Sequence, residues 1–264
     1  MTEPIRSPAH TIAAASSIPG TAIGRQPEAS TTPLLTVQGV TKHFGGIKAL
    51  NGVDLTVAPG RTVGVIGPNG SGKSTLFNVI SGIARADSGS IQYQGTEISR
   101  LSSDRINRLG IARTFQLTRL FGTLSALENL VVVARDEPAV ARQRATELLE
   151  FLSLSHVRDE LGENLSYGQQ KLVEFARLTM NDPTLLLLDE PFAGVNPVIE
   201  QRLLERMADW IQTGKTILLT DHEMGIMMEI CDELYVLDYG EVIAHGTPAE
   251  VRADERVMEA YFGR

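Results

Sequence analysis

Cysteine, basic residues and long apolar runs are all scarce in this chain of 264 residues. Cys231 is the only cysteine, which excludes an internal disulfide framework and a cysteine-rich metal site and favours a reducing compartment. No run of about 20 apolar residues occurs, so no segment is predicted to span a bilayer. Lys and Arg number 24 against 32 Asp and Glu, a net charge of −8. Since proteins that grip nucleic-acid phosphates usually carry a basic surplus, we expect no nucleic-acid partner.

The first 33 residues differ in composition from the rest of the chain. They hold five of the 12 prolines among many Ser, Thr and Ala, without apolar periodicity. This composition predicts a disordered extension over residues 1–33. A signal peptide is the alternative, with its apolar centre at Thr11–Ile18. That centre is interrupted by Ser16 and Ser17, and Glu3 lies where positive charge is expected.

Beyond this extension, residues 34–264 carry the apolar pattern of one α/β domain. Leu34–Val40 and Val53–Val57 alternate as half-buried antiparallel strands do, and Val63–Ile66 is apolar as a strand buried on both faces is. Further short strands are expected at Ile91–Tyr93, Leu185–Leu188, Thr216–Leu219, Leu234–Leu237 and Val242–Ala244.

Helical patterns lie between these strands. Ser74–Gly82 and Ile199–Ile211 are each expected to form one helix, and the block of about 100–180 is expected to be helical throughout. Strands that alternate with helices favour a mostly parallel sheet. The pattern therefore predicts an α/β core with an antiparallel β subdomain and an inserted α-helical subdomain.

A glycine-rich loop follows the strand Val63–Ile66 and precedes a predicted helix. It fits the pattern G-x-x-x-x-G-K-[ST] and consists of Gly67, Pro68, Asn69, Gly70, Ser71, Gly72, Lys73, Ser74 and Thr75. Glycines let successive N–H groups converge on phosphate oxygens, and the helix N-terminus adds positive potential there. In such a loop Lys73 is expected to reach the β- and γ-phosphates, and Ser74 to bind Mg²⁺.

A second apolar strand, Leu185–Leu188, runs into the paired carboxylates of Asp189 and Glu190. In an open α/β sheet, ligands bind beyond the carboxyl ends of the strands, so both acids are expected beside the glycine-rich loop. Asp189 is predicted to hold Mg²⁺ through water, and Glu190 to orient or deprotonate the attacking water. The two motifs together predict hydrolysis of MgATP or MgGTP by in-line phosphoryl transfer.

The stretch Leu165–Gln169, upstream of these acids, resembles the signature motif of ATP-binding-cassette (ABC) ATPases. From the residues alone, the alternative is that Ser166 caps a helix beginning near Gly168. The resemblance implies that Ser166, Gly168 and Gln169 meet the γ-phosphate of ATP bound by a second subunit. Two ATPase subunits, identical or homologous, would then pair head to tail, with ATP and Mg²⁺ as cofactors.

Other positions match the same family in chain order. Phe44 corresponds to the aromatic residue that stacks on adenine, with a core Phe as the alternative. Gln116 matches the glutamine that senses Mg²⁺ and links two subdomains, and His222 the histidine that contacts the γ-phosphate. Asn196 stands where many members carry Asp, and Tyr167 replaces a glycine of the commonest signature. The implied catalytic set is Lys73, Gln116, Glu190 and His222, and the implied metal set is Ser74, Gln116 and Asp189.

The resemblance to ABC ATPases covers residues 34–264. Within that family, the chain most resembles the LivG-type ATPase subunits of branched-chain amino-acid importers. The stretches that carry it are Phe44–Leu50, Arg113–Gln116, Arg119–Phe121, Leu165–Gln170, Gly246–Pro248 and Ala260–Gly263. One departure is that the segment between Val133 and Leu148 is shorter than is usual for that type.

These matches imply a peripheral ATPase subunit at the cytoplasmic face of the inner (plasma) membrane. It would drive separate transmembrane permease subunits through an import cycle, with a solute-binding protein as an indirect partner. The implied solute is a branched-chain or other hydrophobic amino acid. An ABC ATPase acting on ribosomes or DNA is a second possibility, which the single cassette, the missing coiled-coil insertion and the acidic balance disfavour. A non-transport ABC ATPase with a soluble assembly or regulatory partner is the third.

Overall fold

The computed structural model describes residues 32–114 and 120–262. Gln116 and nearly all of the predicted extension over residues 1–33 lie outside these ranges. At the centre is a six-stranded sheet in the order β10-β9-β3-β8-β7-β6, parallel except for the β9–β10 hairpin. Its strands are β3 (Thr62–Ile66), β6 (Ile111–Arg113), β7 (Leu185–Asp189), β8 (Thr216–Thr220), β9 (Glu233–Asp238) and β10 (Glu241–Gly246). The predicted mostly parallel sheet is confirmed.

The sheet is covered on both faces, which explains its uniformly apolar strands. Every residue of β3, β7 and β8 is buried. Along β7, Leu185 and Leu187 pack into one apolar cluster, and Leu186 and Leu188 into the other. Successive side chains of a strand point to opposite faces, so a sheet with two covered faces needs an unbroken apolar run.

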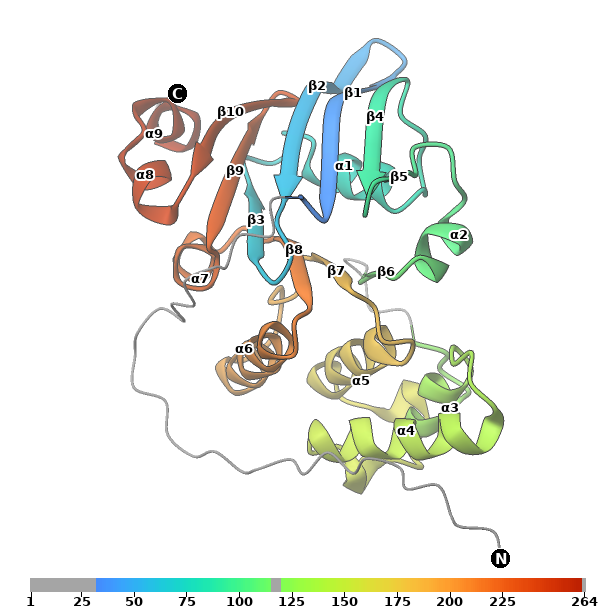
Figure 1. Cartoon of the computed structure of the whole chain (residues 1–264). Coiled ribbons are helices and arrows are strands. Elements are labelled where there is room, and N and C mark those ends of the chain that lie inside the picture. The colour runs from blue at the N-terminus through green and yellow to red at the C-terminus, as the bar shows by residue number, and fades with distance from the viewer. Residues whose placement is uncertain (1–31, 115–119, 263–264) are drawn as a thin grey trace, which may run out of the picture.

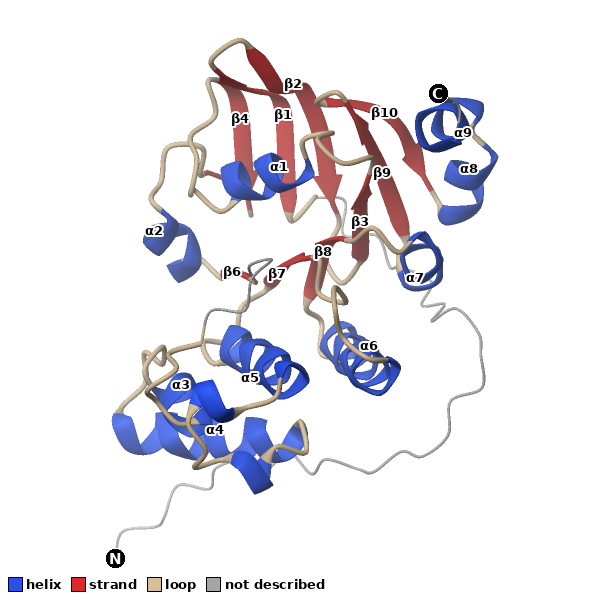
Figure 2. Cartoon of the chain, turned by 180° about the vertical axis from the view of Figure 1, so that it is seen from behind, coloured by secondary structure: helices blue, strands red, loops and turns tan. Residues whose placement is uncertain are grey.

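A smaller antiparallel sheet covers one of these faces, as predicted. Its order is β2-β1-β4-β5, with β1 (Leu35–Phe44), β2 (Ile47–Val57), β4 (Ser88–Tyr93) and β5 (Thr96–Glu97). Helix α1 (Lys73–Ile80) packs against this sheet (Figure 2). Leu76 and Phe77 of α1 belong to the apolar cluster that joins the two sheets.

Helices form a further layer on the opposite side of the central sheet (Figure 1). They are α3 (Ala126–Val131), α4 (Pro138–Phe151), α5 (Tyr167–Thr179) and α6 (Pro197–Gln212). The remaining helices are α2 (Ser103–Arg108), α7 (Met224–Ile230), α8 (Pro248–Ala253) and α9 (Glu255–Phe262). The expectation of helix throughout the block of about 100–180 is wrong at β6, which pairs with β7 in the central sheet. A three-residue strand is too short to show its own periodicity.

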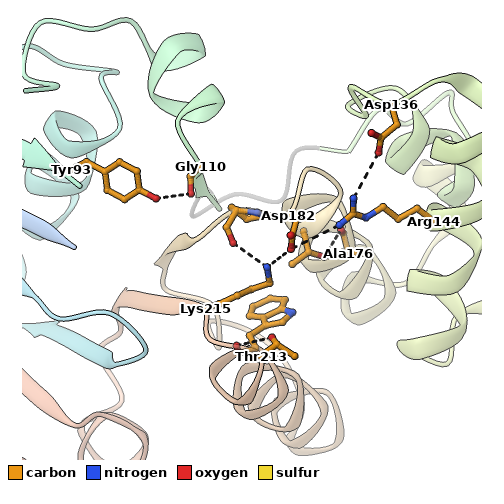
Figure 3. Close-up of polar contacts among 11 residues, drawn as sticks. Tyr93, Gly110, Asp136, Arg144, Ala176, Asp182, Thr213 and Lys215 are labelled. Carbon is orange, nitrogen blue, oxygen red and sulfur yellow. Dashed lines mark hydrogen bonds and ion pairs between the residues drawn. The ribbon is translucent and has the colours of Figure 1, made fainter. Parts of the chain in front are cut away.

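Two kinds of contact attach the helical layer to the sheet. In the turn between α5 and β7, the Asp182 carboxylate pairs with Lys215 and lies 3.9 Å from the guanidinium of Arg144 on α4 (Figure 3). The Asp182 side chain shared by both pairs is 69% exposed, so each pair contributes no more than about 1 kcal/mol. Apolar packing is the stronger contact: Phe175 on α5 and Trp210 on α6, whose ring centroids lie 5.3 Å apart, belong to the same buried cluster as Leu186 and Leu188 of β7.

Candidate nucleotide site

The glycine-rich loop leaves the carboxyl end of β3 and enters α1. Gly67, Gly70 and Gly72 have φ angles of 151°, 82° and 113°. A Cβ on Gly67 would lie 2.1 Å from the carbonyl oxygen of Leu237, and one on Gly72 would lie 2.4 Å from the backbone oxygen of residue 49. A Cβ on Gly70 would meet no atom within 4 Å. Two glycines thus permit close backbone packing, and the third borders open space where a ligand can approach the backbone.

Lys73 is the first residue of α1 and lies inside this loop. Its side chain is buried, and Nζ donates to the carbonyl oxygens of Gly67 at 2.7 Å and Pro68 at 3.0 Å. Burial lowers the pKa of Lys73, while the charges of Glu190 and Asp189 act in the opposite direction. The structure therefore brings the loop lysine and the acidic end of β7 into one site, as the sequence predicts.

Asp189, the last residue of β7, is held on two sides. Its backbone N–H donates to the Thr114 hydroxyl at 3.0 Å, and its Oδ2 accepts from Arg113 Nη2 at 2.7 Å. Burial raises the pKa of Asp189, and the ion pair with Arg113 opposes that shift. The other oxygen, Oδ1, is buried and has no hydrogen-bond partner among residues 32–114 and 120–262.

This donor set fits a magnesium ion that arrives with nucleotide phosphates. Asp189 Oδ1 is an oxygen without a partner, and Ser74 has an exposed hydroxyl at the start of α1. Mg²⁺ is usually held by one or two such protein oxygens together with phosphates and waters. Within the described ranges, no group of three or more His, Cys, Asp or Glu could hold a metal without those phosphates.

Glu190 follows β7 and His222 follows β8, and hydrogen bonds to the Asp221 carboxylate connect the two loops. Glu190, with φ of 49°, donates its N–H to the Thr220 carbonyl at 2.8 Å. The buried Asp221 carboxylate accepts from the N–H groups of Phe192 at 3.3 Å and His222 at 2.8 Å. Burial raises the pKa of Asp221, which the backbone donors oppose. Asp221 is not among the residues predicted from the sequence, although it directly follows the apolar strand Thr216–Thr220 just as Asp189 follows Leu185–Leu188.

Phe44 lies at the end of β1 and its side chain is 52% exposed, so the alternative of a core Phe is wrong. The hairpin that presents it is held by Asp87. The Asp87 carboxylate accepts from Lys42 Nζ at 2.8 Å and from the His43 N–H at 2.6 Å. Stacking of adenine on Phe44 stays a prediction.

The signature residues lie at the start of α5. The Ser166 hydroxyl accepts from the Gln169 N–H at 3.4 Å, and the Gln169 side chain accepts from the Ser166 N–H at 2.9 Å. This reciprocal pair is a capping box, so the predicted helix cap is confirmed. Gly168 packs tightly, since a Cβ there would lie 2.8 Å from Ile199. Because α5 lies in the helical layer and α1 beside the small sheet, Ser166 and the phosphate loop of the same chain belong to separate parts of the fold (Figures 1 and 2).

Two tyrosines reach the site without having been predicted to do so. The Tyr167 hydroxyl donates to the Ala193 carbonyl at 3.0 Å, which joins the start of α5 to the loop after Glu190. Tyr261 of α9 hydrogen-bonds the backbone of Gly67, and burial raises the pKa of Tyr261 to about 12. The C-terminal helix thus contacts the phosphate loop, a tertiary contact that no local pattern predicts.

Comparison with known proteins is consistent with this geometry. The family model described as ABC transporter matches residues 50–193, and the model described as branched-chain amino acid ATP-binding cassette transporter matches residues 241–264. A probable branched-chain amino acid transport ATP-binding protein LivG from Archaeoglobus fulgidus is 39% identical, over 87% of this chain and 95% of its own. The lipopolysaccharide export system ATP-binding protein LptB from Haemophilus influenzae is 37% identical, over 87% of this chain and 97% of its own.

Two solved structures extend the comparison. A nucleotide-free ATP-binding cassette from an ABC transporter superposes with a TM-score of 0.80 at 34% identity, over 88% of this chain and all of that one. A dimeric post-hydrolysis state of an ATP-binding cassette bound to ADP and Pi superposes with a TM-score of 0.74 at 26% identity, over 81% of this chain and 98% of that one.

Proposed function

This chain belongs to the ABC transporter family of ATP-binding cassettes, and from that premise we propose that it energises the import of a branched-chain or other hydrophobic amino acid. As a member it is an ATPase, and cassettes of this family work as dimers with transmembrane permease partners. The observation that carries the finer proposal is the match of residues 241–264 to the branched-chain transporter model, together with the LivG relative.

The chemistry we propose depends on positioning and charge. The triphosphate of ATP would lie on the N–H groups of the loop Gly67–Thr75, with Lys73 beside the β- and γ-phosphates. Ser74 and Asp189, with Gln116, would hold Mg²⁺, which when bound neutralises charge that develops on the phosphates. Glu190 would orient the attacking water and accept its proton, and His222 would contact the γ-phosphate. Each group acts on charge that grows in the transition state.

We further propose that a second ATPase subunit, identical or homologous, completes each site. Ser166 lies in the helical layer, so it would serve the phosphate loop of a partner placed head to tail. Its backbone and hydroxyl lie at a helix N-terminus, which favours an anionic γ-phosphate. The dimeric cassette bound to ADP and Pi supports such a pairing.

We place the chain at the cytoplasmic face of the inner membrane, bound to separate permease chains and only indirectly to a solute-binding protein. In the part of the chain that the structure describes, none of the helices is both long and apolar enough to cross a membrane. A groove of about 180 Å³ opens where β6 meets the helical layer, and its lining includes Val133, Arg177 and Asn181. Phe121 beside it is 50% exposed. This groove between core and helical layer is our proposed contact with a permease.

Reconstitution tests the proposal. The chain would be co-purified with its permease chains and placed in vesicles with a binding protein loaded with leucine. We expect loaded binding protein to stimulate ATP hydrolysis, and Glu190→Gln to remove that stimulation. The LptB relative favours a second candidate, export of a lipid such as lipopolysaccharide, and stimulation by that lipid alone would support it. A stable complex with a soluble protein and with no permease would favour an assembly or regulatory ATPase instead.

A further inference from the structure

A buried guanidinium lies behind the acidic end of β7. Arg113 is the last residue of β6, and its side chain is 7% exposed. Arginine is almost never this buried unless it is paired. Burial lowers the pKa of Arg113, and the ion pair with Asp189 opposes that shift. Arg113 lies in one of the stretches that resemble the ATPase subunits of branched-chain amino-acid importers, and that resemblance implies no function for its side chain.

The contacts of Arg113 join three elements of the fold. Nη2 donates to Asp189 Oδ2 at 2.7 Å, where the Asp189 side chain is 4% exposed. Nη1 donates to Asn78 Oδ1 and to Ser81 Oγ, both at 2.9 Å, and both partners belong to α1 or its C-terminal end. The guanidinium also lies 5.7 Å from the ring centroid of Phe77 on α1. One rigid, planar group therefore connects β6, β7 and the helix that begins with the phosphate-binding lysine.

These contacts leave the Asp189 carboxylate little freedom to turn. Its backbone is fixed by the Thr114 hydroxyl, and Oδ2 is fixed by Arg113. The remaining oxygen, Oδ1, is buried and has no partner within the described ranges. A carboxylate with one oxygen held by an outer partner and the other left available is the usual arrangement of an oriented metal ligand.

We propose that Arg113 is a positioning residue that aims Asp189 Oδ1 at the magnesium of bound MgATP and ties that aim to α1. The inference rests on the proposed function of the site. Lysine in place of Arg113 would keep a positive charge, but a single ammonium lacks the fork that reaches Asp189 and α1 together. Methionine would leave the buried Asp189 without its counter-ion. The competing view is that the ion pair contributes to folding alone.

A measurement of metal affinity distinguishes a positioning role of Arg113 from a purely structural one, and it does not require ATP hydrolysis. Mn²⁺ replaces Mg²⁺ and is titrated into full-length protein saturated with a non-hydrolysable ATP analogue, while unbound Mn²⁺ is followed by its paramagnetic resonance spectrum. We expect Arg113→Met to weaken Mn²⁺ binding by about tenfold to a hundredfold, the range for loss of an outer-shell partner. Analogue binding without metal should not change. Arg113→Lys should recover part of the metal affinity.

Two further variants keep the test informative if Arg113→Met does not fold. The double variant Asn78→Ala with Ser81→Ala leaves Asp189 untouched and should weaken Mn²⁺ binding in the same direction, by less. Arg61→Met removes another Arg–Asp pair, with Asp232 at 3.2 Å, at the opposite end of β3, and should leave Mn²⁺ binding unchanged.

The outcomes that overturn the inference are distinct. If Arg113→Met, or Arg113→Lys with the double variant, binds Mn²⁺ as the wild type does and differs only in thermal stability, Arg113 is merely structural. If the wild type itself binds no analogue and no Mn²⁺, the proposed nucleotide site fails, and this inference fails with it.

Discussion

The glycines of the phosphate loop differ in what surrounds each one. Gly67→Ala would bring a Cβ to 2.1 Å from the Leu237 carbonyl, so the loop must move. We expect it to lower the free energy of unfolding by about 2–3 kcal/mol, at the upper end for single substitutions. Thermal or urea unfolding measures this loss. A Gly67→Ala protein as stable as the wild type would contradict the packing described here.

Gly70→Ala is the matched case with room for its Cβ. Its φ of 82° costs a non-glycine residue about 1–2 kcal/mol, but nothing lies within 4 Å of the new atom. We expect a smaller loss of stability than for Gly67→Ala and a clear loss of ATP affinity, because the added methyl group would occupy space that phosphates need. Titration with a fluorescent ATP analogue measures the affinity, and unchanged binding would show that phosphates do not contact Gly70.

At the scale of elements, the β1–β2 hairpin that presents Phe44 depends on Asp87. Hydrogen bonds from Lys42 and from the His43 backbone lower the pKa of Asp87 to about 2. An unfolded Asp titrates near pKa 3.9, so the folded form favours the carboxylate, and this contribution to stability is complete above about pH 4. It is lost as the pH falls from about 4 to 2.

Asp87→Asn should therefore be less stable than the wild type at pH 7, and the difference should shrink as the pH falls from about 4 to 2. Urea unfolding at a series of pH values measures it. Lys42→Met removes the largest cause of the pKa shift and should reproduce the same trend. A difference that grows toward low pH would contradict the assignment.

The loop before α3 depends on one buried amide. Asn129 Oδ1 accepts from the Phe121 N–H at 2.8 Å, and Nδ2 lies within 3.1 Å of the carbonyl oxygens of Phe121, Leu124 and Ser125. Asn129→Asp keeps the shape but cannot donate, so we expect a loss of about 3 kcal/mol in the free energy of unfolding. Asn164→Asp, at an exposed position, is the control and should change it by less than about 0.5 kcal/mol. Equal effects in the two variants would contradict this role.

At the scale of the whole molecule, assembly and turnover can be separated at Glu190. Glu190→Gln keeps the size of the side chain but cannot accept a proton. We expect it to bind MgATP and form a dimer while hydrolysis falls by at least about a hundredfold. Light scattering after size exclusion measures the dimer, and phosphate release measures turnover.

Glu147→Gln, on the exposed face of α4, is the control and should hydrolyse ATP as the wild type does. Wild-type turnover in Glu190→Gln would remove Glu190 from the proposed role. A Glu190→Gln protein that stays monomeric with MgATP, both alone and with its permease chains, would remove the head-to-tail pairing.

The central strands and the nucleotide motifs could be predicted from the sequence because each is a local pattern. Strands buried on both faces are continuous apolar runs, and β7 was expected within one residue of its observed end. The phosphate loop and Asp189 were expected together because carboxyl ends of neighbouring parallel strands meet at one edge. Ser166 is predicted as a candidate helix cap because serine is favoured at that position, and its reciprocal pairing with Gln169 is seen in the structure.

Residues that act through tertiary contacts could not be predicted in this way. Arg113 lies on a strand of three residues, and its partners Asn78 and Asp189 are 35 and 76 positions away. Tyr261 reaches Gly67 only because α9 packs near the loop. The roles of Gln116 and Phe44 rest on resemblance, and they stay predictions.

The stacked pair Phe175–Trp210 has a practical consequence. Trp210 is the only tryptophan of the chain, and it lies where α5 meets α6. Its intrinsic fluorescence is therefore a label-free optical reporter at the junction between the signature helix α5 and the neighbouring helix α6. Stopped-flow mixing with nucleotide would let an observer time any rotation of one against the other directly, in the unmodified protein.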